Sequence, residues 1–290
     1  MRSNFRARTV PYLFLLPSFA ALLVFSFIPF LQGLYFSLTD YPLLGSPEFV
    51  GFDNFVRLTR DPLFMASLRN TLVYMVATVA LRVVIGLILA VVLNSRLRGR
   101  VFFRAVFYLP VIAPLVTVAV IWRIIFDTYS GVFNAALDLF GVAPIPWLTS
   151  TTWAMPAIVI MSVWKTFGWN IVIFLAGLQS IPATLHEAAA IDGASKLQTF
   201  FRVTLPLLRP TILLAVVTST INASQVFDQV YVMTRGGPGY STMTLGQMVY
   251  TAGFETHDMG YASAVSVVLL LITLVLTLIQ FRAFGEEVSY

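Results

Sequence analysis

Residues 72–93 read LVYMVATVALRVVIGLILAVVL, a run whose one charged side chain is Arg82. About 20 consecutive apolar residues cross the roughly 30 Å hydrocarbon core of a bilayer as an α-helix. The run therefore predicts a transmembrane helix. Similar runs occur at 10–36, 102–126, 153–178, 207–232 and 261–281. We predict an all-α polytopic membrane protein with six transmembrane helices, forming a single transmembrane domain over 1–290.

The composition agrees with this class. Hydrophobic residues make up 58% of the chain and charged residues 11%, with a mean hydropathy of +0.86. Soluble domains carry roughly a quarter charged residues, so a soluble enzyme, a disordered chain and an array of polar repeats are excluded. The absence of cysteine excludes disulfides, zinc-thiolate sites and thiol catalysis.

The basic residues are distributed unevenly between the two sides of the predicted membrane. Eleven Lys and Arg lie in one set of alternate loops and the terminal segments, and four lie in the other set. The positive-inside rule then places both termini in the cytoplasm. This asymmetry, rather than nucleic-acid binding, accounts for the sequence pI of about 9.6. The arginines from Arg96 to Arg104 suit membrane lipid headgroups, although most of that cluster is interpreted as a topology signal.

The predicted cytoplasmic loop 179–206 contains EAAAIDGASKLQTFFRVTLP from Glu187 onward. Its alanines favour a short helix, Gly193 is suited to a left-handed helix end, and Ser195 is suited to cap a second helix. The small side chains form a smooth knob bordered by Glu187 and Asp192. Such a knob fits a groove on another protein, and the alternative is an ordinary interfacial helical hairpin.

The spacing of this loop resembles the cytoplasmic signature of ABC importer permeases that work with a binding protein. The matching residues are Glu187, Ala188, Ala189, Gly193, Val203, Leu205 and Pro206. Asp192, Ala194 and Phe200 extend the match toward the carbohydrate branch. Further stretches resemble the same branch, closest to the maltose-permease first-subunit type, at 49–55, 97–104, 176–182, 234–238 and 260–264. The chain departs from the large enteric version in having six spans rather than eight and no long outer domain.

The resemblance implies a type I ABC importer permease fold and a coupling role for the cytoplasmic loop. That role falls on Glu187, Ala188, Ala189, Asp192 and Gly193, which would dock in a cleft of an ATP-binding subunit. The implied partners are a second homologous permease, two ATP-binding subunits and an extracytoplasmic solute-binding protein. ATP and Mg would be bound by those subunits, since this chain has no phosphate-binding loop motif. The implied location is the plasma membrane of a bacterium or archaeon.

Four charged residues lie inside the predicted spans: Arg82, Arg123, Lys165 and Asp228. Each costs about 2.5–3.5 kcal/mol on insertion scales and is a functional candidate by default. Arg123 lies near a span end, from which a long side chain reaches the interface. Arg82 needs a partner, and structural pairing explains it at least as well as transport. Lys165 and Asp228 either pair with each other or face a solvated cavity.

Neutral polar residues form helical stripes in the fourth and fifth spans. Thr218, Asn222, Gln225 and Gln229 follow the i, i+4, i+7, i+11 pattern, and Ser162, Lys165, Thr166 and Trp169 also share a face. Amides, hydroxyls and an aromatic ring are the groups that bind sugars, and the alternative is hydrogen bonding between helices. The predicted substrate path consists of Ser162, Lys165, Thr166, Trp169, Asn170, Asn222, Gln225, Asp228 and Gln229.

The leading hypothesis is a permease subunit that imports a di- or oligosaccharide. One rival keeps the machinery and changes the cargo to glycerol phosphate or a polyol. A phosphate favours several basic groups along the path, and only Lys165 is well placed in the sequence. A more distant rival is an intramembrane enzyme, which needs catalytic groups clustered at one depth. We predict no catalytic residue, because the spans hold one acid and no histidine. We predict no metal site, because His186 and His257 lie in loops on opposite sides of the membrane, and no nucleic-acid partner, because the few charges fit a topology signal.

Overall fold

The computed structural model describes residues 14–42, 44–95 and 98–284. Within these residues, four helices are long and apolar enough to cross a membrane: Phe14–Phe36, Pro62–Asn94, Ala154–Ser180 and Met259–Phe284. Two further pairs of helices, each bent at a break, are also long and apolar enough to cross a membrane when each pair is taken as one span. The described residues therefore hold up to six spans. The all-α polytopic class is therefore confirmed. The start of the first predicted span and the basic residues 2, 6, 8 and 96 lie outside the described residues.

The chain divides into two compact units. One ends at Asp61 and includes Val249–Val268, and the other comprises Pro62–Met248 and resumes at Leu269. The single transmembrane domain over 1–290 stays a prediction.

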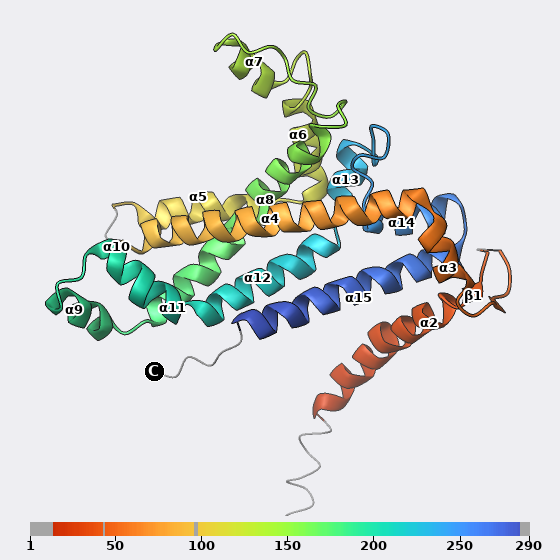
Figure 1. The fold of residues 1–290 in the computed structure, drawn as a ribbon, viewed down its shortest axis with the longest axis horizontal. Helices are drawn as coiled ribbons and strands as arrows, with labels where there is room; N and C mark the ends of the chain where they lie inside the picture. The colour runs from red at the N-terminus through yellow and green to blue at the C-terminus, as the bar shows by residue number, and fades with distance from the viewer. Residues whose placement is uncertain (1–13, 43, 96–97, 285–290) are drawn as a thin grey trace, which may run out of the picture. The chain divides into compact units, whose positions relative to one another are not determined.

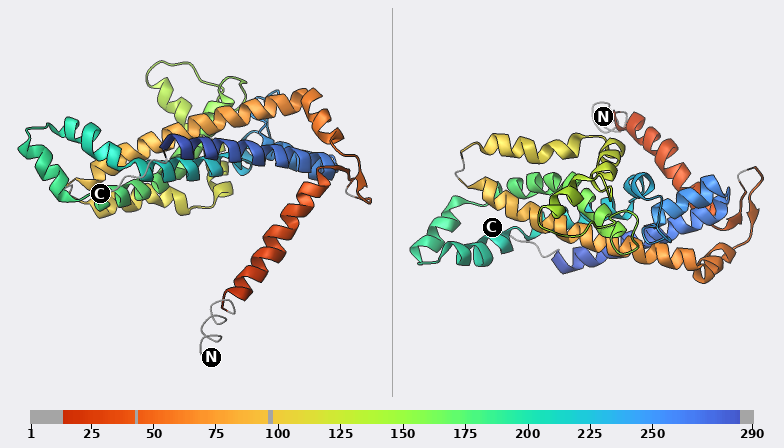
Figure 2. Two further views of the ribbon diagram at one scale, coloured as in Figure 1. Left: turned by 60° about the horizontal axis from the view of Figure 1, so that its bottom comes forward. Right: turned by 90° about the horizontal axis from the view of Figure 1, so that it is seen from above.

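The second unit contains most of the helices. Its elements are α4 (Pro62–Asn94), α5 (Arg100–Ile112), α6 (Leu115–Ile125), α7 (Val132–Asp138), α8 (Ala154–Ser180), α9 (Ala183–Ile191), α10 (Lys196–Thr199), η2 (Phe200–Thr204), α11 (Leu205–Leu207), α12 (Arg209–Ser224) and α13 (Asp228–Met233), followed by the start of α14 (Leu245–Tyr250). Helix α8 packs against α4 and α5, and α12 packs against α4 (Figures 1 and 2). Helix α8 is the most enclosed of the four long helices, because 61% of its 18-residue apolar stretch is buried.

The third predicted span is not one straight helix, which corrects the prediction for 102–126. Helices α5 and α6 meet at an angle of 98°. The break falls at Ala113, which is extended (φ −61°, ψ 142°), immediately before Pro114. The ring of a proline disfavours helical backbone in the residue before it, and proline donates no backbone hydrogen bond. Apolar length alone gives no sign of this bend.

The fifth predicted span, 207–232, is interrupted at both ends. The helical stretch Lys196–Leu207 meets Arg209–Ser224 at 66°. At the other end α12 stops at Ser224, and the chain runs through Gln225–Phe227 without helix before α13 begins at Asp228. The stripe from Thr218 to Gln229 is therefore not a continuous helical face, although the residue types and their order were predicted.

The loop between α6 and α8 is held by one buried side chain. The Asn134 amide nitrogen donates to the carbonyls of Thr128 and Ile145, both at 2.9 Å, and its oxygen accepts from Trp147 Nε1 at 3.0 Å. The exposed Asp127 carboxylate begins the same loop. Hydrogen bonds from the backbone N–H and hydroxyl of Ser130, and from the backbone N–H of Tyr129, hold the pKa of the Asp127 carboxyl below its ordinary value.

The first unit combines the end of the first span with a small outer layer. Its elements are η1 (Leu23–Phe27), α2 (Ile28–Phe36), the antiparallel strands β1 (Thr39–Asp40) and β2 (Glu48–Phe49), α3 (Asp53–Arg60), η3 (Thr251–Glu255) and the first part of α15 (Met259–Phe284). Arg57 forms an ion pair with Asp258 at 2.6 Å, and Tyr261 donates a hydrogen bond to Asp61. These contacts fix α3 against the start of α15.

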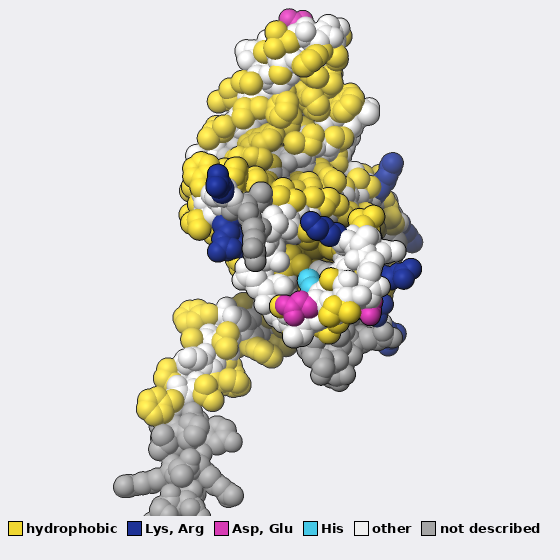
Figure 3. Space-filling model, turned by 90° about the vertical axis from the view of Figure 1, so that its left-hand side faces the viewer, with side chains coloured by type: hydrophobic (Ala, Val, Ile, Leu, Met, Phe, Trp, Pro, Cys, Tyr) yellow, Lys and Arg dark blue, Asp and Glu magenta, His cyan; other side chains and the backbone are white. Residues whose placement is uncertain are grey.

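Charged and hydrophobic side chains occupy different parts of the surface. Figure 3 looks onto the end that carries α9 and α10, where Lys, Arg, Asp and Glu side chains gather. Hydrophobic side chains cover the flanks behind that end. This distribution suits flanks in lipid and an end in water.

Candidate functional site

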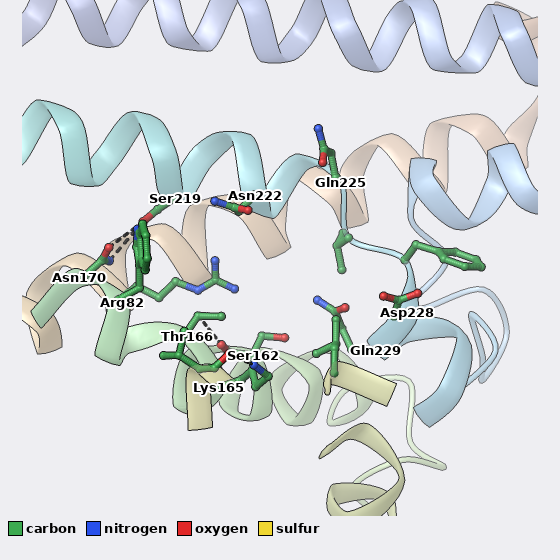
Figure 4. Close-up of a pocket in the computed structure, with 15 residues that line it drawn as sticks. Arg82, Ser162, Lys165, Thr166, Asn170, Ser219, Asn222, Gln225, Asp228 and Gln229 are labelled. Atoms are coloured by element: carbon green, nitrogen blue, oxygen red, sulfur yellow. Dashed lines mark hydrogen bonds between the residues drawn. The ribbon is translucent and has the colours of Figure 1, made fainter. Parts of the chain in front are cut away.

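A cavity of about 410 Å³ lies in the second unit, between α4, α8, α12 and the break before α13 (Figure 4). All nine residues of the predicted substrate path line it: Ser162, Lys165, Thr166, Trp169, Asn170, Asn222, Gln225, Asp228 and Gln229. The cavity wall also includes Arg82 and Ser219, which the sequence prediction did not include. Placing a polar side chain in lipid costs free energy, so the polar residues of membrane helices face the interior of the bundle. The spacing of polar residues in the sequence therefore predicted the residues that line this cavity.

Asn170 and Ser219 join α8 to α12 at one end of the cavity. The Asn170 amide donates to the Ser219 hydroxyl at 3.2 Å, and both side chains are buried. Gly86 of α4 packs against Asn170, since a Cβ placed there would be 2.7 Å from the Asn170 Cβ. The glycine allows α4 to approach α8 closely and fixes the wall of the cavity. Asn170 and Ser219 thus act partly as the helix–helix contact that was the alternative reading of the stripes.

Lys165 and Asp228 both line the cavity and do not form an ion pair; within the described part of the chain the ion pair found is Arg57–Asp258. Lys165 instead donates from Nζ to the carbonyl oxygen of Val111 at 2.9 Å. Val111 lies in the last turn of α5, where carbonyls lack partners within the helix. Of the two readings of Lys165 and Asp228, facing a cavity is the one that the geometry favours.

The stripe residues differ in what they offer the cavity. The Asn222 amide donates to the Thr218 carbonyl of its own helix at 2.7 Å, and its oxygen stays available. Gln229 donates to the Tyr74 hydroxyl at 2.7 Å. Gln225 follows the last residue of α12, and its amide points away from the other labelled polar groups (Figure 4). Gln225 is consequently the weakest of these candidates for binding cargo.

Arg82 is the main residue that sequence reasoning left out of the site. It extends from α4, and its guanidinium lies between Asn222 on one side and Thr166 and Ser162 on the other (Figure 4). The side chain is only 5% exposed. The Tyr74 hydroxyl lies near it, and its Nε is buried without a hydrogen-bond partner. The charge itself was the available signal, but the sequence did not show which helices surround it.

The predicted coupling loop forms the two expected short helices. Helix α9 ends before Gly193, whose φ of +76° is left-handed. Ser195 and Gln198 then make a reciprocal capping box at the start of α10. Glu187, Ala188, Asp192 and Gly193 are exposed, and Ile191 is 86% exposed. Ala189, the fifth residue of the predicted contact, is buried.

Comparison with known proteins identifies the class. Residues 82–283 match the family described as the binding-protein-dependent transport system inner membrane component, and the chain belongs to this family. It is a multi-pass membrane permease and acts as a transport subunit.

Individual relatives cover nearly the whole chain. The trehalose/maltose transport system permease protein MalF of Thermococcus litoralis is 36% identical, over 96% of this chain and 95% of its own. The lactose transport system permease protein LacF of Rhizobium radiobacter is 38% identical, over 95% and 94%. The sn-glycerol-3-phosphate transport system permease protein UgpA of Yersinia pestis is 36% identical, over 100% and 98%.

The fold is that of solved ABC importers. A bacterial ABC transporter involved in import of the acidic polysaccharide alginate aligns with a TM-score of 0.86, over 99% of both chains, at 24% identity. At that identity the likeness shows the fold alone. The importer permease fold that the resemblance implied is thus confirmed.

Proposed function

We propose that the chain forms half of the translocation path of an ABC importer for a carbohydrate, a di- or oligosaccharide. The cavity in the second unit carries the proposal. Its wall combines the amides of Asn170, Asn222 and Gln229 with the hydroxyls of Ser162 and Thr166. Such groups replace the water that a sugar hydroxyl loses on leaving solvent. Trp169, which is half exposed, offers an aromatic face for the apolar side of a sugar ring.

The relatives support this cargo class. Two of the three are named for transport of disaccharides, trehalose or maltose and lactose, and each spans nearly the same length as this chain. The relative named for sn-glycerol-3-phosphate transport supports the second candidate cargo, and Arg82 adds a basic group that this candidate needs.

The exposed hairpin of α9 and α10 is proposed to couple transport to ATP hydrolysis. Its outer surface presents Glu187, Ala188, Asp192 and Gly193, and Ala189 is the buried member of the predicted set. The occupant would be one of two ATP-binding subunits, which bind the ATP and Mg that drive the cycle. A second homologous permease and an extracytoplasmic solute-binding protein complete the proposed assembly, in the plasma membrane of a bacterium or archaeon.

Reconstitution tests the proposal directly. The chain would be coexpressed with the permease, ATPase and binding protein encoded beside it, and purified through a tag on this chain. We expect an ATPase to copurify and ATP-dependent uptake of a labelled disaccharide into proteoliposomes. Copurification with uptake of glycerol 3-phosphate and of no disaccharide would select the second candidate. Purification without any ATPase would contradict an importer role and favour the alternative hypothesis of an intramembrane enzyme.

A further inference from the structure

The cavity contains an excess of positive charge. Two cationic side chains, Arg82 and Lys165, and one acidic side chain, Asp228, line it. Arginine stays charged at every physiological pH, and a charge removed from water needs an opposite charge or dense hydrogen bonding. The charge of Arg82 therefore needs a compensating group in or beside the cavity.

The neighbours of Arg82 compensate it incompletely. The neutral hydroxyl of Tyr74 lies near the guanidinium, and it accepts a hydrogen bond from Gln229. The Nε atom is buried and has no hydrogen-bond partner, although the whole side chain is only 5% exposed. An arginine fork offers five N–H donors, so several of them remain for a ligand in the cavity.

Asp228 does not serve as the counter-ion. No ion pair joins it to Arg82 or Lys165 within the part of the chain that the structure describes. Asp228 lies in the first turn of α13, where a negative charge is favoured by the helix dipole. In Figure 4 Gln229 lies between the Asp228 carboxylate and the Arg82 guanidinium.

Lys165 of α8 adds a second set of donors to the same cavity. Its ammonium uses one hydrogen bond on the Val111 carbonyl and keeps two N–H groups. The planar guanidinium of Arg82 and the ammonium of Lys165 line one cavity, and this combination of donors is suited to bind an oxyanion.

We propose that Arg82 and Lys165 form an anion subsite in the cavity, so that the transported carbohydrate carries an oxyanion, a uronate carboxylate or a phosphate ester. The inference rests on the proposed function and narrows its substrate class. The neutral amides would bind the hydroxyls of the cargo while the two cations bind its acidic group.

A charge-matched pair of cargoes tests the subsite. The complete transporter with its binding protein would be reconstituted, and uptake measured for a disaccharide with one uronate residue and for its neutral methyl ester. A second arm compares glycerol 3-phosphate with glycerol, which separates a phosphate from a carboxylate. Uptake is normalised to assembled complex, and the acid-to-ester ratio is compared between wild type and Arg82→Gln. The binding protein is the same in both, so the change in the ratio isolates the permease.

We expect wild type to favour the charged member of one pair, and Arg82→Gln to lower that preference about tenfold, as loss of one charge-assisted hydrogen bond predicts. Arg82→Lys should retain part of it. Arg123→Gln is the control, because Arg123 is a charged residue of α6 that does not line this cavity. A merely structural Arg82 would lower uptake of both members equally, which would overturn the proposal.

Two other outcomes separate the failures. If wild type imports a neutral disaccharide and neither charged probe, the anion subsite is wrong and the carbohydrate function stands. If no saccharide, sugar acid or phosphate ester enters, the proposed function itself fails.

Discussion

The amide of Gln229 donates a hydrogen bond of 2.7 Å to the hydroxyl of Tyr74, although 155 residues separate them. Tyr74 is fully buried and Gln229 is 7% exposed. The bond joins α13 to α4 at the cavity wall, near the guanidinium of Arg82. The phenol thus orients an amide that faces the cavity.

Removing that phenol should destabilise the fold. In Tyr74→Phe, the Gln229 donor loses its partner in a buried setting, which costs about 1–3 kcal/mol. We expect a lower melting temperature of the purified transporter in detergent. Tyr129→Phe is the matched control, since Tyr129 is 95% exposed and should melt as wild type does. Equal melting temperatures for both variants would show that the Tyr74 bond adds nothing to stability.

Much of this architecture could be predicted because lipid makes composition decisive. A long apolar run has few folds available when backbone groups find no water to bind, so α4 and α8 could be predicted from apolar length. The same reasoning located the cavity, because Asn170 and Gln229 cannot face lipid without cost. The Gly193 turn and the Ser195 cap were also predictable, since both depend on local backbone chemistry.

The remainder depends on backbone breaks and on neighbours. Hydropathy depends on the polarity of side chains and not on the backbone conformation. It therefore did not predict the bend at Pro114 or the non-helical stretch that begins at Gln225. A periodic stripe also presumes an unbroken helix, and the break turned the Gln225 amide away from its neighbours. Arg82 was missed because the sequence does not specify that α4 packs against α8 and α12.

The coupling loop offers a test by backbone strain alone. Gly193 has φ +76° and Gly141 has φ +70°, and a Cβ at either position would meet nothing within 4 Å. Valine in such a conformation costs on the order of 1–3 kcal/mol or shifts the backbone. Gly193→Val should abolish uptake and stimulated ATPase at normal expression, whereas Gly141→Val, in the loop before α8, should retain both.

A charge reversal supplies a second test of the same loop. Glu187→Lys changes an exposed residue of α9 without strain and should also reduce uptake and coupling. Full activity in both Gly193→Val and Glu187→Lys would remove the hairpin from the transport mechanism.

The topology predicts which positions are accessible from each side. The native chain has no cysteine, so single cysteines report cleanly. Cysteines replacing Arg98 and Lys196 should resist an impermeant maleimide in intact cells and react after lysis, whereas those replacing Asp53 and Gly237 should react at once. Labelling of position 196 in intact cells would contradict the six-span arrangement.

The cargo path is tested most sharply at Asn222. Its side chain is exposed to the cavity, and its oxygen remains available once the nitrogen has bonded to Thr218. One neutral hydrogen bond to a sugar hydroxyl contributes roughly 0.5–1.5 kcal/mol, and an unpaired partner costs about 1–3 kcal/mol. Since 1.4 kcal/mol is a factor of ten, Asn222→Leu should lower uptake about tenfold.

Gln225→Leu should have a smaller effect than Asn222→Leu, because the Gln225 amide points away from the other polar groups. Ile221→Leu is the control: it conserves volume at a half-exposed position of the same helix that does not line the cavity. If Asn222→Leu dissociates the complex while uptake per assembled complex stays normal, this polar face holds helices together and does not bind cargo.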